Sequence, residues 1–454
     1  MIDPERIQPL NSLPDRSGDY VAYWMQASQR AEYNHALEFA VREANNRKQP
    51  LLVVFGVTPD YPEANLRHYT FMLEGLRETQ EALKDRGIRM VVSRQSPDKA
   101  ALGVAEHASL LVADRGYLRF QVDWRHRVAE DAPCPVVQVE SDVIVPVETA
   151  SPKEEYAAAT IRPKIHKHVE HFLKSVRSSR VKRDSLGLKV NGWSIDNVEA
   201  ALSELRVDRG VGPVTAFEAG TAEARKRLDA FISNRLDDYP EQRNHPELDA
   251  VSHMSPYLHF GQISPLQIAL KVERAGGKSR EAKDDYLEEL IVRRELSMNF
   301  VYYNWDYDAY TSLPDWARKT LEAHKKDKRD PIYKTEAFEA AETNDPYWNA
   351  AQKEMVLTGK MHNYMRMYWG KKILEWSASP EEAFKTALYL NNKYELDGRD
   401  PNSFAGVAWC FGKHDRPWTE RKIFGKVRYM NDNGLRRKFD MDAYLAKVEA
   451  LQAP

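Results

Sequence analysis

Two serines stand just ahead of a proline in the segment SHMSPYLHFGQISP, residues 252–265. We predict that Ser252 and Ser255 are N-cap residues before Pro256, because serine side chains accept hydrogen bonds from the free N–H groups of a first helical turn. The same free N–H groups can bind phosphate. The chemistry suggested is phosphate binding, and an ordinary capped helix is the simpler alternative.

A second candidate is the segment LNNKYELDGRDPNSFAGVAWCFGKHDRPW, residues 390–418, which leaves the helical pattern at DGRDP. Asp397, Arg399, Asp400 and Asn402 crowd into this turn-rich stretch. Loops that carry so many polar side chains are often functional, because a rigid scaffold holds them at the surface. We therefore expect this loop to contribute to a binding site.

The third candidate is TGKMHNYMRMYWGKKILEW, residues 358–376, which we predict to be one amphipathic helix. Trp369 and Trp376 are seven residues apart, so they share one face about 10 Å apart along the helix axis. Three methionines precede them and Arg366 lies among them. Core packing explains the pattern in general, although a core would more often use leucine.

Residues 412–428, GKHDRPWTERKIFGKVR, hold six basic residues against two acidic ones, whereas the whole chain has a net charge of −2. This is the one local surface suited to a polyanion such as DNA. A solvated charged face is the commoner explanation of such a run.

The elements that must position these residues fall into two parts. Up to about residue 150, short β-branched runs alternate with helical stretches, which predicts a doubly wound α/β domain with a parallel sheet. No G-x-G-x-x-G follows a predicted strand, so the usual dinucleotide fingerprint is absent. We predict an interdomain linker over residues 151–214, and an all-α domain over residues 215–454 that holds seven of the ten tryptophans.

Composition excludes several classes of protein. No apolar run approaches the length of a membrane span, and the first residues do not resemble a targeting signal, so we expect a cytoplasmic protein. Two distant cysteines argue against a disulfide framework and against thiolate-rich metal sites. His166, His168 and His171 lack carboxylate or cysteine neighbours at ligand spacing, so we expect no metal.

Five segments together resemble the class II cyclobutane pyrimidine dimer photolyases, within the photolyase and cryptochrome family. They are SPYLHFGQIS, EELIVRRELSMNFVYYNW, TGKMHNYMRMYWGKKILEW, KYELDGRDPN and FGKVRYMN, in the family's order. The resemblance covers essentially the whole chain. It implies the photolyase/cryptochrome architecture, with an N-terminal α/β antenna domain and a helical domain that binds FAD and DNA.

The resemblance also implies an activity: light-driven repair of pyrimidine dimers by electron transfer from reduced FAD to a flipped-out dimer. Trp369, Trp348 and Trp376 match a relay that photoreduces FAD, with Trp369 nearest the flavin. Asn391 matches the asparagine near flavin N5, and Arg366 and Asp397 match an ion pair beside the isoalloxazine. The residues matched to the rest of the FAD site are Tyr239, Val251, Ser252, His253, Met254 and Ser255.

Substrate contacts are implied in the same way. Glu289 matches the acid that contacts the dimer. The other residues expected at the lesion or along the DNA are Arg243, Arg293, Met367, Trp409, Arg416, Trp418 and Arg428. Arg293 stands where other photolyase classes carry a tryptophan that stacks on the lesion, which leaves Trp409 as the main aromatic platform. The segment CFGKHDRP is one residue shorter than the family's usual version.

The implied partners are FAD, UV-damaged DNA and an antenna pigment, for which a deazaflavin is the family-based expectation. We expect a monomer, associated with the nucleoid when bound to DNA, or nuclear in a eukaryote. One alternative is a cryptochrome-like flavin photoreceptor without repair activity, although cryptochromes commonly carry a long C-terminal extension. The other is a colourless helical module that binds nucleic acid by aromatic stacking.

Overall fold

The computed structural model describes residues 2–452 and contains one six-stranded sheet. Its strands lie in the order β1-β6-β5-β2-β3-β4, and all neighbours are parallel except β1, which pairs antiparallel with β6 at the edge. The strands are β1 (Ile7–Pro9), β2 (Tyr20–Trp24), β3 (Leu51–Gly56), β4 (Arg89–Ser93), β5 (Ala108–Asp114) and β6 (Val136–Val139). The predicted parallel sheet is confirmed, and β1 is an addition to it.

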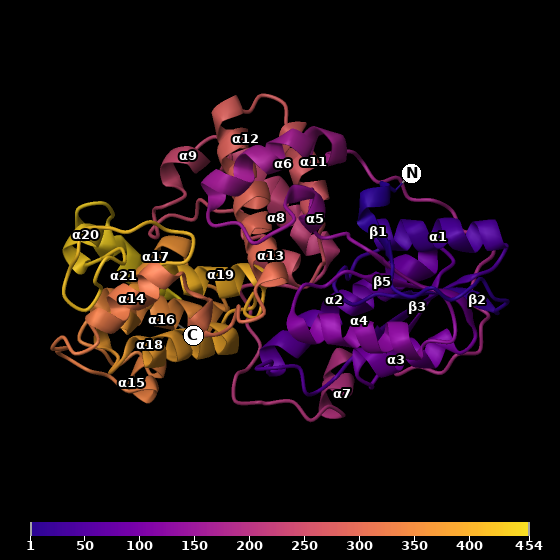
Figure 1. Cartoon of the computed structure of the whole chain (residues 1–454), viewed down its shortest axis with the longest axis horizontal. Coiled ribbons are helices and arrows are strands. Elements are labelled where there is room, and N and C mark those ends of the chain that lie inside the picture. The colour runs from indigo at the N-terminus through magenta and orange to yellow at the C-terminus, as the bar shows by residue number, and fades with distance from the viewer. Residues whose placement is uncertain (1, 453–454) are drawn as a thin grey trace.

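Helices cover both faces of the sheet, as the unbroken apolar strands require. On one face lie α1 (His35–Arg47), α2 (Leu66–Asp85) and α7 (Val198–Ser203), and on the other α3 (Pro97–Ala105) and α4 (Arg119–Asp131). Figure 1 shows this α/β part, with the helical part beside and above it. The doubly wound fold is confirmed.

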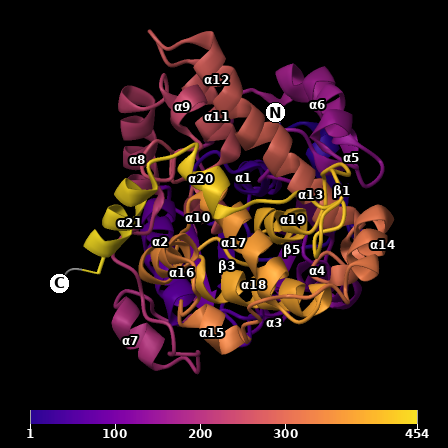
Figure 2. The same cartoon turned by 90° about the vertical axis from the view of Figure 1, so that its left-hand side faces the viewer.

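The helical part begins after the segment that holds α5 (Val147–Ala150), α6 (Ala158–Phe172) and α7. Its helices are α8 (Thr221–Asn234), α9 (Tyr239–Gln242), α10 (Ser255–His259), α11 (Pro265–Glu273), α12 (Arg280–Leu287), α13 (Arg294–Tyr303), α14 (Asp315–Ala323), α15 (Thr335–Glu339), α16 (Pro346–Thr358), α17 (Asn363–Trp376), α18 (Pro380–Tyr394), α19 (Pro401–Cys410), α20 (Asp432–Arg436) and α21 (Met441–Ala450). In Figure 2, α17, α18 and α19 lie next to one another near the centre.

One helix prediction needs correction, and one helical stretch is irregular. The helix predicted over residues 358–376 is α17 alone, because α16 ends at Thr358 and Gly359 takes a left-handed conformation with φ +73°. Glycine adopts that conformation without the steric cost of a side chain, and it commonly ends helices. The helical stretch through EELIVR is not regular either, because Glu288–Arg293 forms a π-helical segment, η2, between α12 and α13.

The two parts pack closely against each other. At Gly261, with φ +67°, a β-carbon would lie 1.9 Å from the carbonyl oxygen of Ala27 in the α/β part. Arg30 donates to the Gly261 carbonyl over 3.0 Å, and Arg67 donates to the backbone carbonyls of Val356 and Tyr394. The domain boundaries at residues 150 and 214 stay a prediction. Within residues 2–452, no helix is long and apolar enough to cross a membrane.

Candidate functional site

The segment Val251–Ser255 lies against residues that are distant in the sequence. Ser255 Oγ accepts a hydrogen bond from Lys360 Nζ over 2.8 Å, and Ser252 Oγ accepts one from Tyr286 over 3.0 Å. Neither serine caps α10, because Met254 holds the N-cap position and makes no side-chain bond there. The capping prediction is therefore wrong: Ser255 instead joins α10 to Lys360, and Ser252, ahead of α10, binds Tyr286 of α12.

Three buried charged groups meet where α17 faces the loop after α18. Arg366 Nη2 lies 3.1 Å from Glu395 Oε1 and 3.6 Å from Asp397 Oδ1. The predicted pair of Arg366 and Asp397 is present, but Glu395 is the nearer partner. Burial raises the pKa of Glu395 to about 8. Burial also opposes ionisation of Asp397, yet Arg366 and Lys360 hold its pKa at about 2. Asp397 is therefore the more readily ionised of the two acids.

Buried polar atoms without a protein partner gather around this cluster. They are Asn391 Oδ1, Glu395 Oε2, Asp397 Oδ1 and Arg366 Nε. Folded proteins leave few such atoms, because each costs free energy. The set contains both acceptors and donors, which fits a polar heterocycle with both kinds of edge, such as a flavin. These atoms mark a candidate ligand site.

Asn391 lies on α18 with its amide held in one orientation. Its Nδ2 donates to Ser403 Oγ over 2.8 Å and to Asn392 Oδ1 over 3.2 Å, so Oδ1 points elsewhere and has no protein partner. Only an external N–H or O–H donor would satisfy this buried oxygen.

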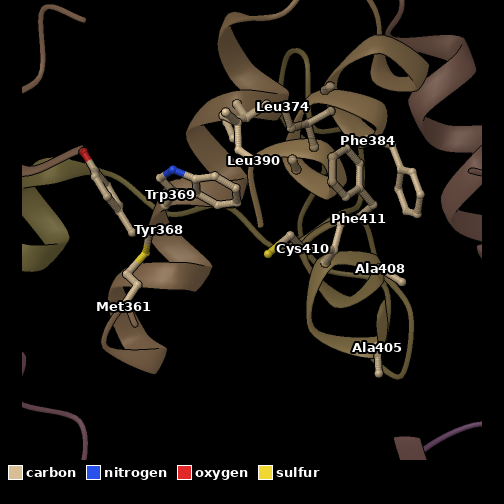
Figure 3. Packing of buried hydrophobic residues seen from close by; sticks show 14 of the residues in the cluster. Met361, Tyr368, Trp369, Leu374, Phe384, Leu390, Ala405, Ala408, Cys410 and Phe411 are labelled. Atoms are coloured by element: carbon tan, nitrogen blue, oxygen red, sulfur yellow. The ribbon is translucent and has the colours of Figure 1, made fainter. Parts of the chain in front are cut away.

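Trp369, Trp348 and Trp376 form a continuous row in the buried core. The ring centroids of Trp348 and Trp369 are 6.3 Å apart with planes only 7° from parallel, and Trp376 lies 6.3 Å from Trp348. Tyr333, half-buried, lies 5.7 Å beyond Trp376. Figure 3 shows Trp369 among buried side chains of α17, α18 and α19, including Leu390 and Cys410. Trp348 lies between the other two, an order that the sequence did not specify.

Glu289 and Arg243 join the π-helical segment to the end of α9. Arg243 Nη1 lies 2.7 Å from Glu289 Oε1, and both side chains are partly exposed. Glu288, the preceding residue, instead pairs with Arg162 at 2.7 Å and with Arg293 at 3.3 Å. The π turn inserts an extra residue per turn, which changes the direction of neighbouring side chains and often marks a functional site.

Trp418 stands at the surface between two arginines of the basic segment 412–428. The guanidinium carbons of Arg416 and Arg428 lie 5.3 Å and 5.1 Å from its ring centroid, and its side chain is 40% exposed. Trp409 and Met367 are half-buried on α19 and α17. These aromatic and basic residues are therefore at least partly accessible, and two guanidinium groups form cation–π contacts with the Trp418 ring.

Residues of the linker hold the loop after α19 in place. The sequence did not predict these contacts. Tyr156 donates to the carbonyl of Asp415 over 2.8 Å and accepts from Trp316 Nε1 over 3.0 Å. Lys413 forms an ion pair with Glu154. These contacts hold the loop in one position, and its expected one-residue shortening stays a prediction.

Sequence reasoning missed Glu395, Lys360 and Gln352. Glu395 lies within KYELDGRDPN, two residues before Asp397, so the motif held the signal. Lys360 lies near Glu395 and Asp397 only because Gly359 turns the chain between α16 and α17. Gln352 accepts a hydrogen bond from the indole N–H of Trp369, and none of the sequence motifs includes Gln352.

A cavity lies at the junction of the two parts, with an empty volume of about 970 Å³ that includes solvent at its mouth. Aromatic side chains form much of its wall, among them Phe55, Tyr61, Tyr117 and Phe260. None of the residues predicted to hold FAD lines it. This cavity is therefore separate from the cluster of unpartnered polar atoms.

Comparison with known proteins agrees with this architecture. A family model described as DNA photolyase matches residues 21–182. The deoxyribodipyrimidine photo-lyase of Methanothermobacter thermautotrophicus is 53% identical over 99% of both chains, and that of Arabidopsis thaliana is 40% identical over 98% of this chain and 91% of its own. A class III photolyase from Agrobacterium tumefaciens and a cryptochrome from Synechocystis each share the fold with a TM-score of 0.73. They are 17% and 16% identical, and the alignments cover 98% and 95% of this chain and 91% and 89% of theirs. The chain belongs to the photolyase and cryptochrome family.

Proposed function

We propose that the chain is a class II photolyase that repairs cyclobutane pyrimidine dimers in DNA with light. The proposed activity is supported by relatives that align over nearly the whole chain and are named deoxyribodipyrimidine photo-lyase. The class II assignment rests on the five segments that resemble the class II enzymes, from SPYLHFGQIS to FGKVRYMN. Arg293, in place of a lesion-stacking tryptophan, also supports class II.

The residues that would hold FAD are Tyr239, Val251–Ser255, Arg366, Asn391 and Asp397. The single observation that carries this site is the group of unpartnered polar atoms around Arg366 and Asn391, because these atoms need a ligand with matching donors and acceptors. Bound in its reduced form and excited by light, FAD supplies the electron that splits the dimer. His253 has a left-handed backbone, φ 56°, a strain that functional sites often contain.

The chain's own residues would do the rest. Glu289 donates or accepts a hydrogen bond at the dimer, Trp409 and Met367 line the lesion pocket, and Arg243 balances the charge of Glu289. Arg416, Trp418 and Arg428 contact DNA on either side of a dimer that is flipped out of the duplex, as photolyases are known to do. Trp376, Trp348 and Trp369 pass electrons inward when FAD must be reduced again.

We place the antenna pigment in the cavity between the two parts. A deazaflavin is planar and largely apolar with polar edges, which suits aromatic walls interrupted by Gln26, Gln29, Gln121 and Asp142. An archaeal photolyase from Sulfolobus tokodaii with the same fold is described as holding two FAD molecules.

The function is tested by light-dependent repair. The purified protein, reduced and loaded with FAD, is expected to remove thymine dimers from an irradiated oligonucleotide under blue light and not in the dark. Bound reduced FAD without repair would favour the cryptochrome-like photoreceptor, whose fold the Synechocystis protein shares. A preparation that stays colourless with added FAD would favour the nucleic-acid-binding module.

Replacing Glu289 by glutamine is expected to lower the repair yield per absorbed photon severalfold while FAD stays bound. The carboxyl group would contact the dimer while it carries extra charge, and hydrogen bonds to charged groups are among the stronger ones. The measurement is the quantum yield with pre-reduced enzyme. Asp284→Asn is the matched control, because Asp284 on α12 pairs with exposed Arg280, neither is among the residues placed at the lesion, and its yield should not change. An unchanged yield in Glu289→Gln would make Glu289 structural.

Replacing Asn391 by leucine is expected to lower the reduction potential of bound FAD. Asn391 Oδ1 has no hydrogen-bond donor in the protein. Reduced flavin has an N–H at N5 that could donate to this oxygen, whereas oxidised flavin has none. Loss of this bond should disfavour reduction by about 1–2 kcal/mol, or roughly 20–40 mV for two electrons. A spectroelectrochemical titration measures the shift. Ser403→Ala removes one of the two partners of Nδ2 and leaves Oδ1 in place, so it should shift the potential less. A potential that does not fall in Asn391→Leu would contradict this role.

A further inference from the structure

We propose that Gln352 keeps the indole N–H of Trp369 in place while this ring is oxidised, so that the positive charge passes along the tryptophan row instead of being trapped. This role rests on the proposed relay. Gln352 lies on α16, is fully buried, and accepts from Trp369 Nε1 through Oε1 over 2.9 Å. It would act through Trp369 and touch neither FAD nor DNA.

The orientation of the Gln352 amide is set by its other end. Its Nε2 faces the carbonyl of Glu339 over 3.4 Å, which leaves Oε1 directed at the indole. An amide oxygen accepts a hydrogen bond but has almost no basicity, so it cannot take the proton. A carboxylate at the same position would have both properties.

The second indole has the same type of partner. Trp348 Nε1 donates to the backbone carbonyl of Trp369 over 3.0 Å, and a backbone carbonyl is likewise not a base. The centroids of the two stacked rings are 6.3 Å apart. Both inner members of the row therefore donate their N–H to groups that cannot remove a proton. Carboxylates on or near α16 are engaged elsewhere: Asp345 with the N-terminus of α16 and Tyr368, Glu354 with Tyr444.

The consequence follows from the chemistry of indole. When Trp369 gives up one electron, its ring becomes a radical cation, whose N–H proton is far more acidic than that of neutral indole. If a base took the proton, the remaining neutral radical would no longer carry the charge onward. With Gln352 as partner, the proton stays. An electron from Trp348 then restores Trp369, and Trp376 restores Trp348. A soluble thiol or similar reductant supplies the last electron at the outer end.

The test compares Gln352→Glu, which places a base at the indole, with Gln352→Leu, which removes the acceptor. After a light flash on protein with oxidised FAD, the wild type should show protonated tryptophan radical cations. Gln352→Glu should show a neutral radical early and a several-fold lower yield of lasting charge separation, at a pH where its infrared band shows an ionised carboxylate. Asn349→Asp is the matched control, because Asn349 lies on α16 but bonds Thr343. It should behave as the wild type.

A readout on flavin-free protein tests the hydrogen bond itself. The indole N–H resonance of Trp369 in a ¹⁵N–¹H spectrum should move upfield in Gln352→Leu and stay in Asn349→Asp. An unmoved resonance would overturn the assigned contact. If Gln352→Glu, with its carboxylate ionised, gave the radical spectra and yield of the wild type, the role of Gln352 would be overturned. The relay itself would still stand if photoreduction were blocked in Trp369→Phe. Normal photoreduction in Trp369→Phe would overturn the relay, and this role with it.

Discussion

Trp369→Phe should lose nearly all photoreduction of oxidised FAD, while the same variant, reduced chemically in the dark, still repairs dimers. Phenylalanine fills most of the space but is far harder to oxidise than indole, so the row loses its inner member. The centroid distances of 6.3 Å from Trp369 to Trp348 and from Trp348 to Trp376 make each single step short. Steady illumination with an external reductant, followed by flavin absorbance, measures the rate.

The control for this variant is Trp316→Phe. Trp316 lies on α14, where it bonds Tyr156 rather than the tryptophan row, so photoreduction should continue at the wild-type rate. Because Trp369 Nε1 also binds Gln352, the FAD content of each variant must be measured to exclude a folding defect. Photoreduction at the wild-type rate in Trp369→Phe would show that electrons reach FAD by another route.

Much of the fold could be predicted because local pattern and tertiary structure agree. The five β-branched runs of the first 150 residues are all strands, since a strand buried on both faces must be apolar throughout. β1 escaped prediction because three residues, Ile7–Pro9, carry no periodicity. Gly359 was present in the sequence, yet helical periodicity on both sides of it hid the break between α16 and α17.

The site was harder to predict, because its members meet only in three dimensions. Family motifs supplied Arg366, Asn391 and Asp397, but the preference of Arg366 for Glu395 depends on an ångström-scale difference in distance. The π-helical segment at Glu289 has no sequence pattern of its own, because the hydrophobic residues on either side of it follow the ordinary helical spacing. Lys360 and Gln352 act through polar contacts with residues distant in the sequence, which hydrophobic periodicity cannot reveal.

Arg366→Met should destabilise the flavin-free protein by about 3–5 kcal/mol near pH 8 and abolish FAD binding, because it removes the nearest cation of two buried carboxyl groups and leaves them only Lys360. The loss should depend on pH. The folded-state pKa of Glu395, about 8, lies above its ordinary value of 4.5, so its contribution to stability is complete below pH 4.5 and is lost as the pH rises to 8. That of Asp397, about 2, lies below 3.8, so its contribution is present above pH 3.8 and is lost toward pH 2.

Without Arg366, both carboxyl groups would resist ionisation, and the difference from the wild type should therefore be largest at pH 8 and shrink toward pH 4. Urea unfolding followed by tryptophan fluorescence at several pH values measures it. Glu395→Gln in the Arg366→Met background should recover part of the stability at pH 8, because a neutral amide replaces one of the two acids while keeping its shape. A deficit that is the same at pH 4 and pH 8 would mean that Arg366 stabilises the fold by packing alone, and that its charge is not what binds this cluster together.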